Sequence, residues 1–224
     1  LNIGSHSHGV QTGRMLERLE AELQQVRPDW LVVYGDTNST LAAALAAAKL
    51  HIPVAHVEAG LRSRNKQMPE EVNRILTDHV SELLFTPTQT ASRNLLSEGF
   101  GADQIKRVGD VMYDAALYYA SIASNRSTIL SSLDLLPKQY ILATIHRAEN
   151  TNDKERLTHI FDALGYVSKK HRVLIPLHPR TRAKLDFWGI TPEGLEVVNP
   201  VGYLDMIMLE QHAMAIVTDS GGVQ

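Results

Sequence analysis

Several ionisable side chains come directly after short apolar runs of the sequence, where parallel α/β proteins gather their functional groups. They are Asp36 after Trp30–Tyr34, Glu58 after Val54–Val57, His146 after Tyr140–Ile145, His178 after Val173–Leu177 and Asp219 after Met214–Thr218. The carboxyl ends of parallel strands meet at one edge of a sheet, and the loops that bind ligands converge there. Carboxylates and histidines at such an edge are suited to proton transfer. We therefore expect a ligand site built from these residues.

The first two carboxylates also have purely structural interpretations. Asp36 could cap the alanine-rich helix that follows it, because aspartate is a favoured N-cap residue. Glu58 could form an ion pair with Arg62 or Arg64, which lie in the next loop. Both alternatives stay open at this point.

Glu70 and Glu71 follow Pro69, which marks the first turn of a helix. Carboxylates in that turn are favoured by the helix dipole whatever their function, so on their own they are read as structural. His146 opens the polar run that ends at Asn150. Such a run is costly to fix beside a buried strand, which favours a functional role for His146.

A glycine-containing turn follows the last apolar run. Ser220, Gly221 and Gly222 can present backbone N–H groups to a phosphate at the start of a helix. The turn lacks the lysine of a P-loop and the glycine spacing of a dinucleotide-binding fold, so alone it is a weak motif.

Composition excludes several classes of function. The ten histidines include no H-E-x-x-H pair or three-ligand cluster, and there is no cysteine, so we expect neither a metal site nor a cofactor. With 25 acidic against 22 basic residues, the chain offers no basic field for nucleic acid or an anionic membrane. No apolar stretch approaches the roughly 20 residues of a membrane span. The absence of cysteine suits a reducing compartment, so a cytoplasmic location is expected.

Alternating strand and helix patterns must position these residues. Apolar spacing and turn residues predict helices over 10–26, 39–49, 88–98, 111–120, 154–169 and 203–211, and a helix starting at Pro69. They predict strands over 30–34, 53–57, 82–85, 105–108, 140–145, 173–177, 195–198 and 214–218. The run 30–34 is typical of a strand covered on both faces. This alternation predicts an α/β fold with parallel sheets.

The serine-rich stretch 121–132 shows no clear period and is the best candidate for a linker. We therefore expect an N-terminal Rossmann-like domain over residues 1–120 and a second Rossmann-like domain over 133–224. Two α/β domains facing one another across a cleft are the economical interpretation.

Five segments resemble, in order, the motifs of the non-hydrolysing UDP-N-acetylglucosamine 2-epimerase family. They are Gly35–Ser39, His56–Ser63, Pro69–Arg74, Thr144–Asn150 and Thr218–Gln224. The resemblance implies two Rossmann-like domains of the GT-B type, a UDP-sugar in the cleft between them and a homodimer. Because family members extend beyond both ends of this segment, it also implies a chain truncated at both ends. One departure is Met206, which stands where many members place an aromatic side chain under the uracil.

The resemblance implies that UDP-GlcNAc and UDP-ManNAc are interconverted, for cell-surface polysaccharide precursors, by elimination of UDP to 2-acetamidoglucal and readdition. Matched residue by residue, the catalytic positions are Asp36, Glu58, Glu70 and His146. Glu58 or Asp36 would be the first base, Glu70 would serve the opposite face of the sugar, and His146 would stabilise the departing diphosphate. The residues expected to bind UDP are Ser220, Gly221, Gly222, Arg62 and Arg147.

Other segments look like a branch of the family that acts on UDP-2,3-diacetamido-2,3-dideoxyglucuronate. They are Arg14 within 8–15, Met68–Glu71, Leu177–Thr181 and Pro200–Leu204. A uronate carboxylate would be met by an arginine, and the candidates are Arg62, Arg64, Arg147 and Arg180. Two further alternatives stay open, a GT-B glycosyltransferase and a non-catalytic UDP-sugar binder.

Overall fold

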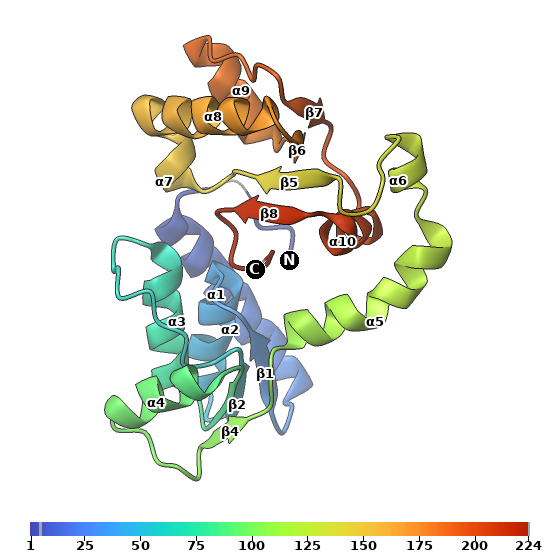
Figure 1. Cartoon of the computed structure of the whole chain (residues 1–224). Coiled ribbons are helices and arrows are strands. Elements are labelled where there is room, and N and C mark those ends of the chain that lie inside the picture. Colours follow the sequence, from blue (N-terminus) through green and yellow to red (C-terminus); the bar gives the residue numbers. More distant parts are fainter. Residues whose placement is uncertain (5, 224) are drawn as a thin grey trace. The chain divides into compact units, whose positions relative to one another are not determined.

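A computed structural model describes residues 1–4 and 6–223 (Figure 1). The chain divides into two compact units, unit 1 over Leu1–Val111 and unit 2 over Met112–Gln224. Each unit contains one four-stranded parallel sheet with helices between the strands. This confirms the predicted α/β class with two Rossmann-like units. Gln224, the last residue of the predicted glycine-rich motif, lies outside the described residues.

Unit 1 has the strand order β1-β2-β3-β4. Its helices are α1 (His8–Val26), α2 (Asn38–Lys49), α3 (Pro69–His79) and α4 (Gln89–Ser97). Its strands are β1 (Leu31–Tyr34), β2 (Val54–Val57), β3 (Leu83–Thr86) and β4 (Ile105–Arg107). Thr37 and Thr88 cap α2 and α4 with their side chains, and Pro69 begins α3, so local capping chemistry fixes where these helices start.

Small residues let the first two helices of unit 1 pack closely. Ala44, Ala46 and Ala47 of α2 are fully buried and join Leu23 of α1 and Val54 of β2 in one core cluster. The strand β1 differs from its prediction, because it alternates rather than being covered on both faces. Its side chains at positions 32 and 34 are 48% and 64% exposed, whereas position 33 is 5% exposed.

Unit 2 has the strand order β7-β6-β5-β8. Its helices are α5 (Val111–Arg126), which begins at the last residue of unit 1, α6 (Ile129–Ser132), α7 (Ala148–Thr151), α8 (Lys154–Ser168), α9 (Pro179–Trp188) and α10 (Tyr203–His212). Its strands are β5 (Tyr140–Thr144), β6 (Arg172–Pro176), β7 (Glu196–Val198) and β8 (Ala215–Thr218). The stretch 121–132, predicted as a linker, lies inside unit 2 and is mostly helical.

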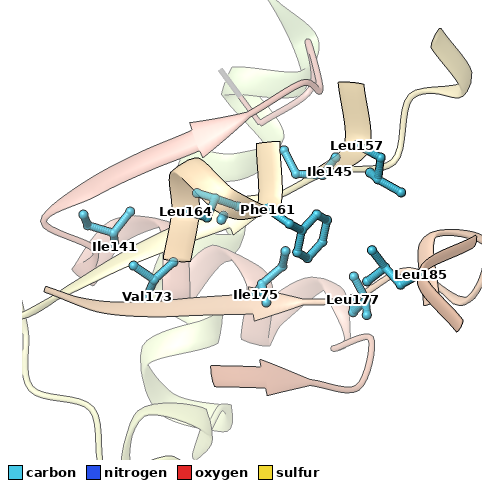
Figure 2. Packing of buried hydrophobic residues seen from close by; sticks show 10 residues of the cluster. Ile141, Ile145, Leu157, Phe161, Leu164, Val173, Ile175, Leu177 and Leu185 are labelled. Carbon is cyan, nitrogen blue, oxygen red and sulfur yellow. The ribbon is translucent and has the colours of Figure 1, made fainter. Parts of the chain in front are cut away.

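Alternate residues of β5 and β6 bury both faces of this sheet. One face packs against α8, where Phe161 lies among apolar side chains from the strands and from α9 (Figure 2). On the other face Tyr140 and Leu142 pack with Leu209 of α10. The Tyr140 hydroxyl donates to the Leu209 carbonyl at 2.6 Å, and burial raises the pKa of Tyr140 to about 12. The central strands β5 and β6 therefore present mainly their ends to a ligand.

No helix among the described residues has both the length and the apolar character needed to cross a membrane.

Candidate functional site

Two turns at the carboxyl ends of β1 and β2 bring the predicted carboxylates of unit 1 together. Tyr34 pairs with Val57 in the parallel register, so the turns that follow these two residues are neighbours. Gly35 has φ +65°, and a β-carbon there would lie 3.6 Å from Glu58 Oε2. The Glu58 carboxylate therefore rests against the peptide that precedes Asp36.

Glu58 has the strongest chemical signature of the predicted site. Its φ of +76° lies in the left-handed region, where a side chain is strained and where functional residues are over-represented. Burial raises its pKa, and the nearby charges of Asp36 and Asp110 raise it further, against the opposing effect of Arg74 and His56. A carboxylate held in this way accepts a proton more readily than an ordinary one, which is the property of a general base.

Asp36 is held by α3 and does not cap a helix. The structure therefore removes one alternative, because the cap of α2 is Thr37. Asp36 forms an ion pair with Arg74, and its backbone carbonyl accepts a hydrogen bond of 2.9 Å from Asn73. Asn73 also donates to Asn38 at 3.1 Å, so α3 fixes the whole turn after β1.

Glu70 and Glu71 are adjacent in sequence but lie in different surroundings. Glu70 is exposed on the first turn of α3, whereas Glu71 is 1% exposed and accepts the backbone N–H groups of Ser63 and Arg64 at 2.9 and 2.8 Å. Burial raises the pKa of Glu71, but these hydrogen bonds and the charge of Arg74 outweigh it and the pKa is lowered. Glu71 is a structural anion, and Glu70 remains available to a substrate.

Arg62 is engaged within unit 1. Its side chain is 4% exposed and pairs with Asp78 at 2.7 Å and with Glu98 at 2.6 Å. Burial lowers the pKa of Arg62, but the hydrogen bonds and charges of Glu98 and Asp78 outweigh it, and the pKa is raised. The alternative in which Glu58 pairs with Arg62 is not what the structure has. The assignment of Arg62 to UDP stays a prediction.

His146 and Arg147 lie at the carboxyl end of β5 in unit 2, where Asp219 fixes their backbone. Asp219 accepts the N–H groups of His146 at 3.1 Å and of Arg147 at 3.0 Å, and the amide of Asn150 at 2.9 Å. The His146 side chain is 43% exposed, with Nδ1 3.3 Å from Asp219 and its ring 6.4 Å from that of His178. Asp219 is thus the organiser of this loop, a role that its place in a strand-ending motif could have suggested.

The glycine turn after β8 is open to solvent. Gly221 and Gly222 are exposed, and the N–H of Ser220 is turned inward to the Thr218 hydroxyl at 2.9 Å. The Arg147 guanidinium is 3.9 Å from the point where a β-carbon of Gly221 would stand. An arginine beside an exposed glycine backbone suits an anionic group such as a phosphate.

Met206 packs against the core cluster around Leu209 and Tyr140.

Among residues 1–4 and 6–223, no three histidine or acidic side chains gather closely enough to hold a metal ion.

Two Rossmann-like α/β units, one carrying strand-end carboxylates and the other a histidine and a glycine turn, define a protein of the GT-B-like class. The family model described as "UDP-N-acetylglucosamine 2-epimerase" matches residues 1–224. The chain belongs to this family.

Relatives and solved structures support the same family assignment. A UDP-N-acetylglucosamine 2-epimerase homolog of Methanococcus maripaludis is 51% identical, covering 100% of this chain and 64% of its own length. A UDP-2,3-diacetamido-2,3-dideoxy-D-glucuronate 2-epimerase of Pseudomonas aeruginosa is 52% identical, covering 100% and 62%. The crystal structure of Methanocaldococcus jannaschii UDP-GlcNAc 2-epimerase with UDP-GlcNAc and UDP matches with a TM-score of 0.91 and 45% identity, over 100% of this chain and 64% of that one. The chain thus spans just under two thirds of the length of these proteins.

Proposed function

We propose that the protein is a UDP-sugar 2-epimerase that interconverts UDP-GlcNAc and UDP-ManNAc. The observation that carries this proposal is Glu58, a strained carboxylate with a raised pKa beside the Asp36 turn, in a chain that matches the epimerase family from end to end. Relatives named UDP-N-acetylglucosamine 2-epimerase, 45% and 46% identical to this chain, support the choice of sugar.

C2 of the sugar has no neighbouring carbonyl to acidify its proton. Removal of this proton is therefore coupled to departure of UDP, and the elimination needs a base. In the first step a base takes the C2 proton, and the C2–H electron pair forms the C1=C2 double bond. The C1–O bond breaks, and its electron pair leaves with UDP. UDP and 2-acetamidoglucal then recombine, with the UDP oxygen bonding to C1 and a proton delivered to the opposite face of C2. Two faces call for two proton-transfer groups.

We assign the first proton transfer to Glu58 rather than Asp36. Asp36 is committed to an ion pair with Arg74, whereas burial and two neighbouring carboxylates raise the pKa of Glu58. Exposed Glu70 is the candidate for the second face. Asp36 would contribute negative charge that stabilises an oxocarbenium-like sugar.

In unit 2, His146 and Arg147 would stabilise the departing diphosphate, because Asp219 binds both their N–H groups next to the glycine turn and the Arg147 side chain lies near Gly221. Backbone N–H groups of Gly221 and Gly222 would hold its phosphates, whereas the predicted contribution of Ser220 is not its N–H, which donates to the Thr218 hydroxyl. The proposal needs no cofactor, since elimination and readdition are redox-neutral.

The test is to incubate the full-length protein with UDP-GlcNAc in deuterated water and to follow the C2 proton by NMR. We expect the C2 signal to disappear as UDP-ManNAc forms. Glu58→Gln should stop this exchange and still bind UDP, while Glu17→Gln, an exposed carboxylate of α1, should behave as wild type. Full activity in Glu58→Gln would reject the base assignment. Transfer of the sugar to an acceptor, or UDP binding without turnover, would point to a glycosyltransferase or a non-catalytic binder.

A second substrate is favoured by the 52% identity to the diacetamido-glucuronate epimerase of Pseudomonas aeruginosa. Of the arginines that could meet its carboxylate, Arg64 and Arg180 are exposed, whereas Arg62 is engaged in ion pairs. The same exchange experiment with that UDP-sugar decides between the two substrates, because C2 exchange with only one of them identifies it.

We also propose a cytoplasmic homodimer that binds no nucleic acid. The lack of cysteine suits a reducing compartment, and the net charge of −3 does not attract nucleic acid. Light scattering on the full-length protein, giving the mass of one or two chains, tests the assembly.

A further inference from the structure

Helix α3 buries polar side chains and exposes apolar ones. Glu71, Asn73, Thr77 and Asp78 are buried, whereas Val72 and Leu76 are 39% and 43% exposed. A helix normally buries its apolar stripe. Because α3 buries polar side chains instead, it contacts the rest of unit 1 through hydrogen bonds and ion pairs, which depend on direction. This face of α3 touches the two turns that carry the proposed catalytic carboxylates.

Asp78 lies at the centre of these contacts and is 0% exposed. Its Oδ1 is 2.7 Å from Nδ1 of His56. Its Oδ2 accepts the backbone N–H of Gly60 at 3.1 Å and lies 2.7 Å from Nη1 of Arg62. One carboxylate therefore contacts the chain on both sides of Glu58, at positions 56 and 60.

His56 extends this link to the other turn. Its Nε2 donates to the Gly35 carbonyl at 2.8 Å, and a carbonyl oxygen can only accept. Its Nδ1 lies 2.7 Å from Asp78, whose other carboxylate oxygen contacts the Arg62 guanidinium. Both ring nitrogens of this buried side chain are thus engaged in hydrogen bonds. Gly35 precedes Asp36, so the ring connects Asp78 to the first turn.

Basic and acidic side chains alternate along a chain of contacts in this cluster. They are His56, Asp78, Arg62 and Glu98, and successive members lie 2.7, 2.7 and 2.6 Å apart. Burial of a charge is costly unless it is paired, and here each buried charge has an opposite neighbour. Arg62 thus lies between two carboxylates, Asp78 and Glu98, which explains why its donors turn inward.

We propose that Asp78 and His56 are positioning residues that hold the Asp36 and Glu58 turns in one geometry, with Arg62 serving this cluster and not the diphosphate. The inference rests on the proposed epimerase function. Displacement of a reacting group by about 1 Å can cost about 100-fold in rate, so the cluster should act on kcat and leave substrate binding largely intact.

The test compares Asp78→Asn with Thr77→Val in the full-length protein. Thr77 is the neighbouring buried polar residue of α3, and its hydroxyl has no hydrogen-bond partner among the described residues. We expect Asp78→Asn to lower kcat by about 100-fold and to change KM by less than about threefold, with wild-type affinity for UDP. Thr77→Val should keep wild-type kcat. A kcat for Asp78→Asn within about threefold of Thr77→Val would overturn the proposal.

Two further variants separate the two links of His56. His56→Gln keeps an amide donor near the place of Nε2 and hence the contact with Gly35, whereas His56→Asn keeps one near Nδ1 and hence the contact with Asp78. A kcat below that of the wild type in both variants supports the proposal, and wild-type kcat in both would reject it. These variants carry the test if Asp78→Asn does not fold.

A pH profile distinguishes positioning from mere loss of structure. Around Glu58, burial, Asp36 and Asp110 raise its pKa, while Arg74 and the His56 ring lower it. Replacing the ring in His56→Gln removes this lowering effect and should therefore move the acid limb of kcat/KM to higher pH. A lower plateau with an unmoved limb would mean a structural role only and would overturn the inference.

Failure of the proposed epimerase function can be distinguished from failure of the positioning inference. If the wild type shows no C2 exchange with either UDP-sugar, the epimerase proposal fails, and the cluster is then tested by amide hydrogen exchange. Faster exchange of the Gly60 amide in Asp78→Asn than in Thr77→Val supports the positioning cluster, and equal exchange rejects it.

Discussion

Gly60 should be among the least replaceable residues of unit 1, because two separate costs coincide there. Its φ of +78° is left-handed, and a β-carbon would stand 2.5 Å from the carbonyl oxygen and 2.9 Å from the carbonyl carbon of Ala91. An alanine in the left-handed region costs roughly 1 to 2 kcal/mol. Overpacking against the backbone of α4 adds typically 1 to 3 kcal/mol. We therefore expect Gly60→Ala to destabilise unit 1 by about 2 to 5 kcal/mol.

Gly99 provides the matched control for the backbone cost. Its φ is +95°, and a β-carbon there would have no atom within 4 Å. Gly99→Ala should therefore lose only the conformational part, about 1 to 2 kcal/mol. The difference between the two variants measures the close approach of Gly60 to α4.

The assay is urea unfolding followed by tryptophan fluorescence. The two tryptophans, Trp30 and Trp188, lie in unit 1 and unit 2 respectively. In a Trp188→Phe background Trp30 reports on unit 1, and the midpoint of its transition at constant slope gives the change in free energy of unfolding. Equal losses for Gly60→Ala and Gly99→Ala would refute the packing argument.

Three further outcomes can be measured in the same background. Thr77→Val should stabilise unit 1 by about 1 kcal/mol, since it removes a buried hydroxyl without a partner among the described residues, and a lower urea midpoint would contradict this. Although burial raises the pKa of Glu71, hydrogen bonds and Arg74 lower it below the ordinary 4.5, so its contribution to stability is present above that value and is lost as the pH falls through the lowered one. The urea midpoint of Glu71→Gln should therefore lie furthest below that of the wild type at pH 7 and approach it as the pH falls below 4.5. Burial, Asp36 and Asp110 raise the pKa of Glu58, so this group costs stability as the pH rises. Glu58→Gln should therefore raise the urea midpoint at pH 7 but not at pH 4, and an unchanged midpoint at pH 7 would count against a half-buried, charged Glu58.

Strands and most helices were predictable because their signals are local. Short apolar runs, the helical period of 3.6 residues, turn residues and Pro69 place most boundaries within a few residues of those in the structure. The helix α9 was missed, although Pro179 at its start is a recognised signal.

The serine-rich stretch shows why a local signal can fail. Ser121 and Ser124 donate their hydroxyls to carbonyls three residues earlier, so they do not break α5. Ala123 is buried with Ile207 and Met208 of α10. A tertiary contact, which no local pattern reveals, thus carries the helix through the stretch predicted as a linker.

In the site, residue types were predictable but partners were not. Asp36 and Arg74 are 38 residues apart, so their ion pair depends on how α3 packs against the turn after β1. Glu70 and Glu71 have the same chemistry and neighbouring positions, and only the orientation of α3 separates an exposed carboxylate from a buried one. His56 belongs to one of the family-like motifs, but its hydrogen bond with Asp78 joins positions 22 residues apart, which the motif does not indicate.

The polar face of α3 has a consequence for how unit 1 responds to disturbance. Contacts between hydrocarbon side chains tolerate small sliding movements because they have no preferred direction, whereas hydrogen bonds weaken steeply when their angle falls below about 120°. A shift of α3 along its axis would break the bonds of Glu71, Asn73, Arg74 and Asp78 at the same time. We therefore expect α3 to dock in a single register or to detach, so that the turns after β1 and β2 become ordered together and lose their order together.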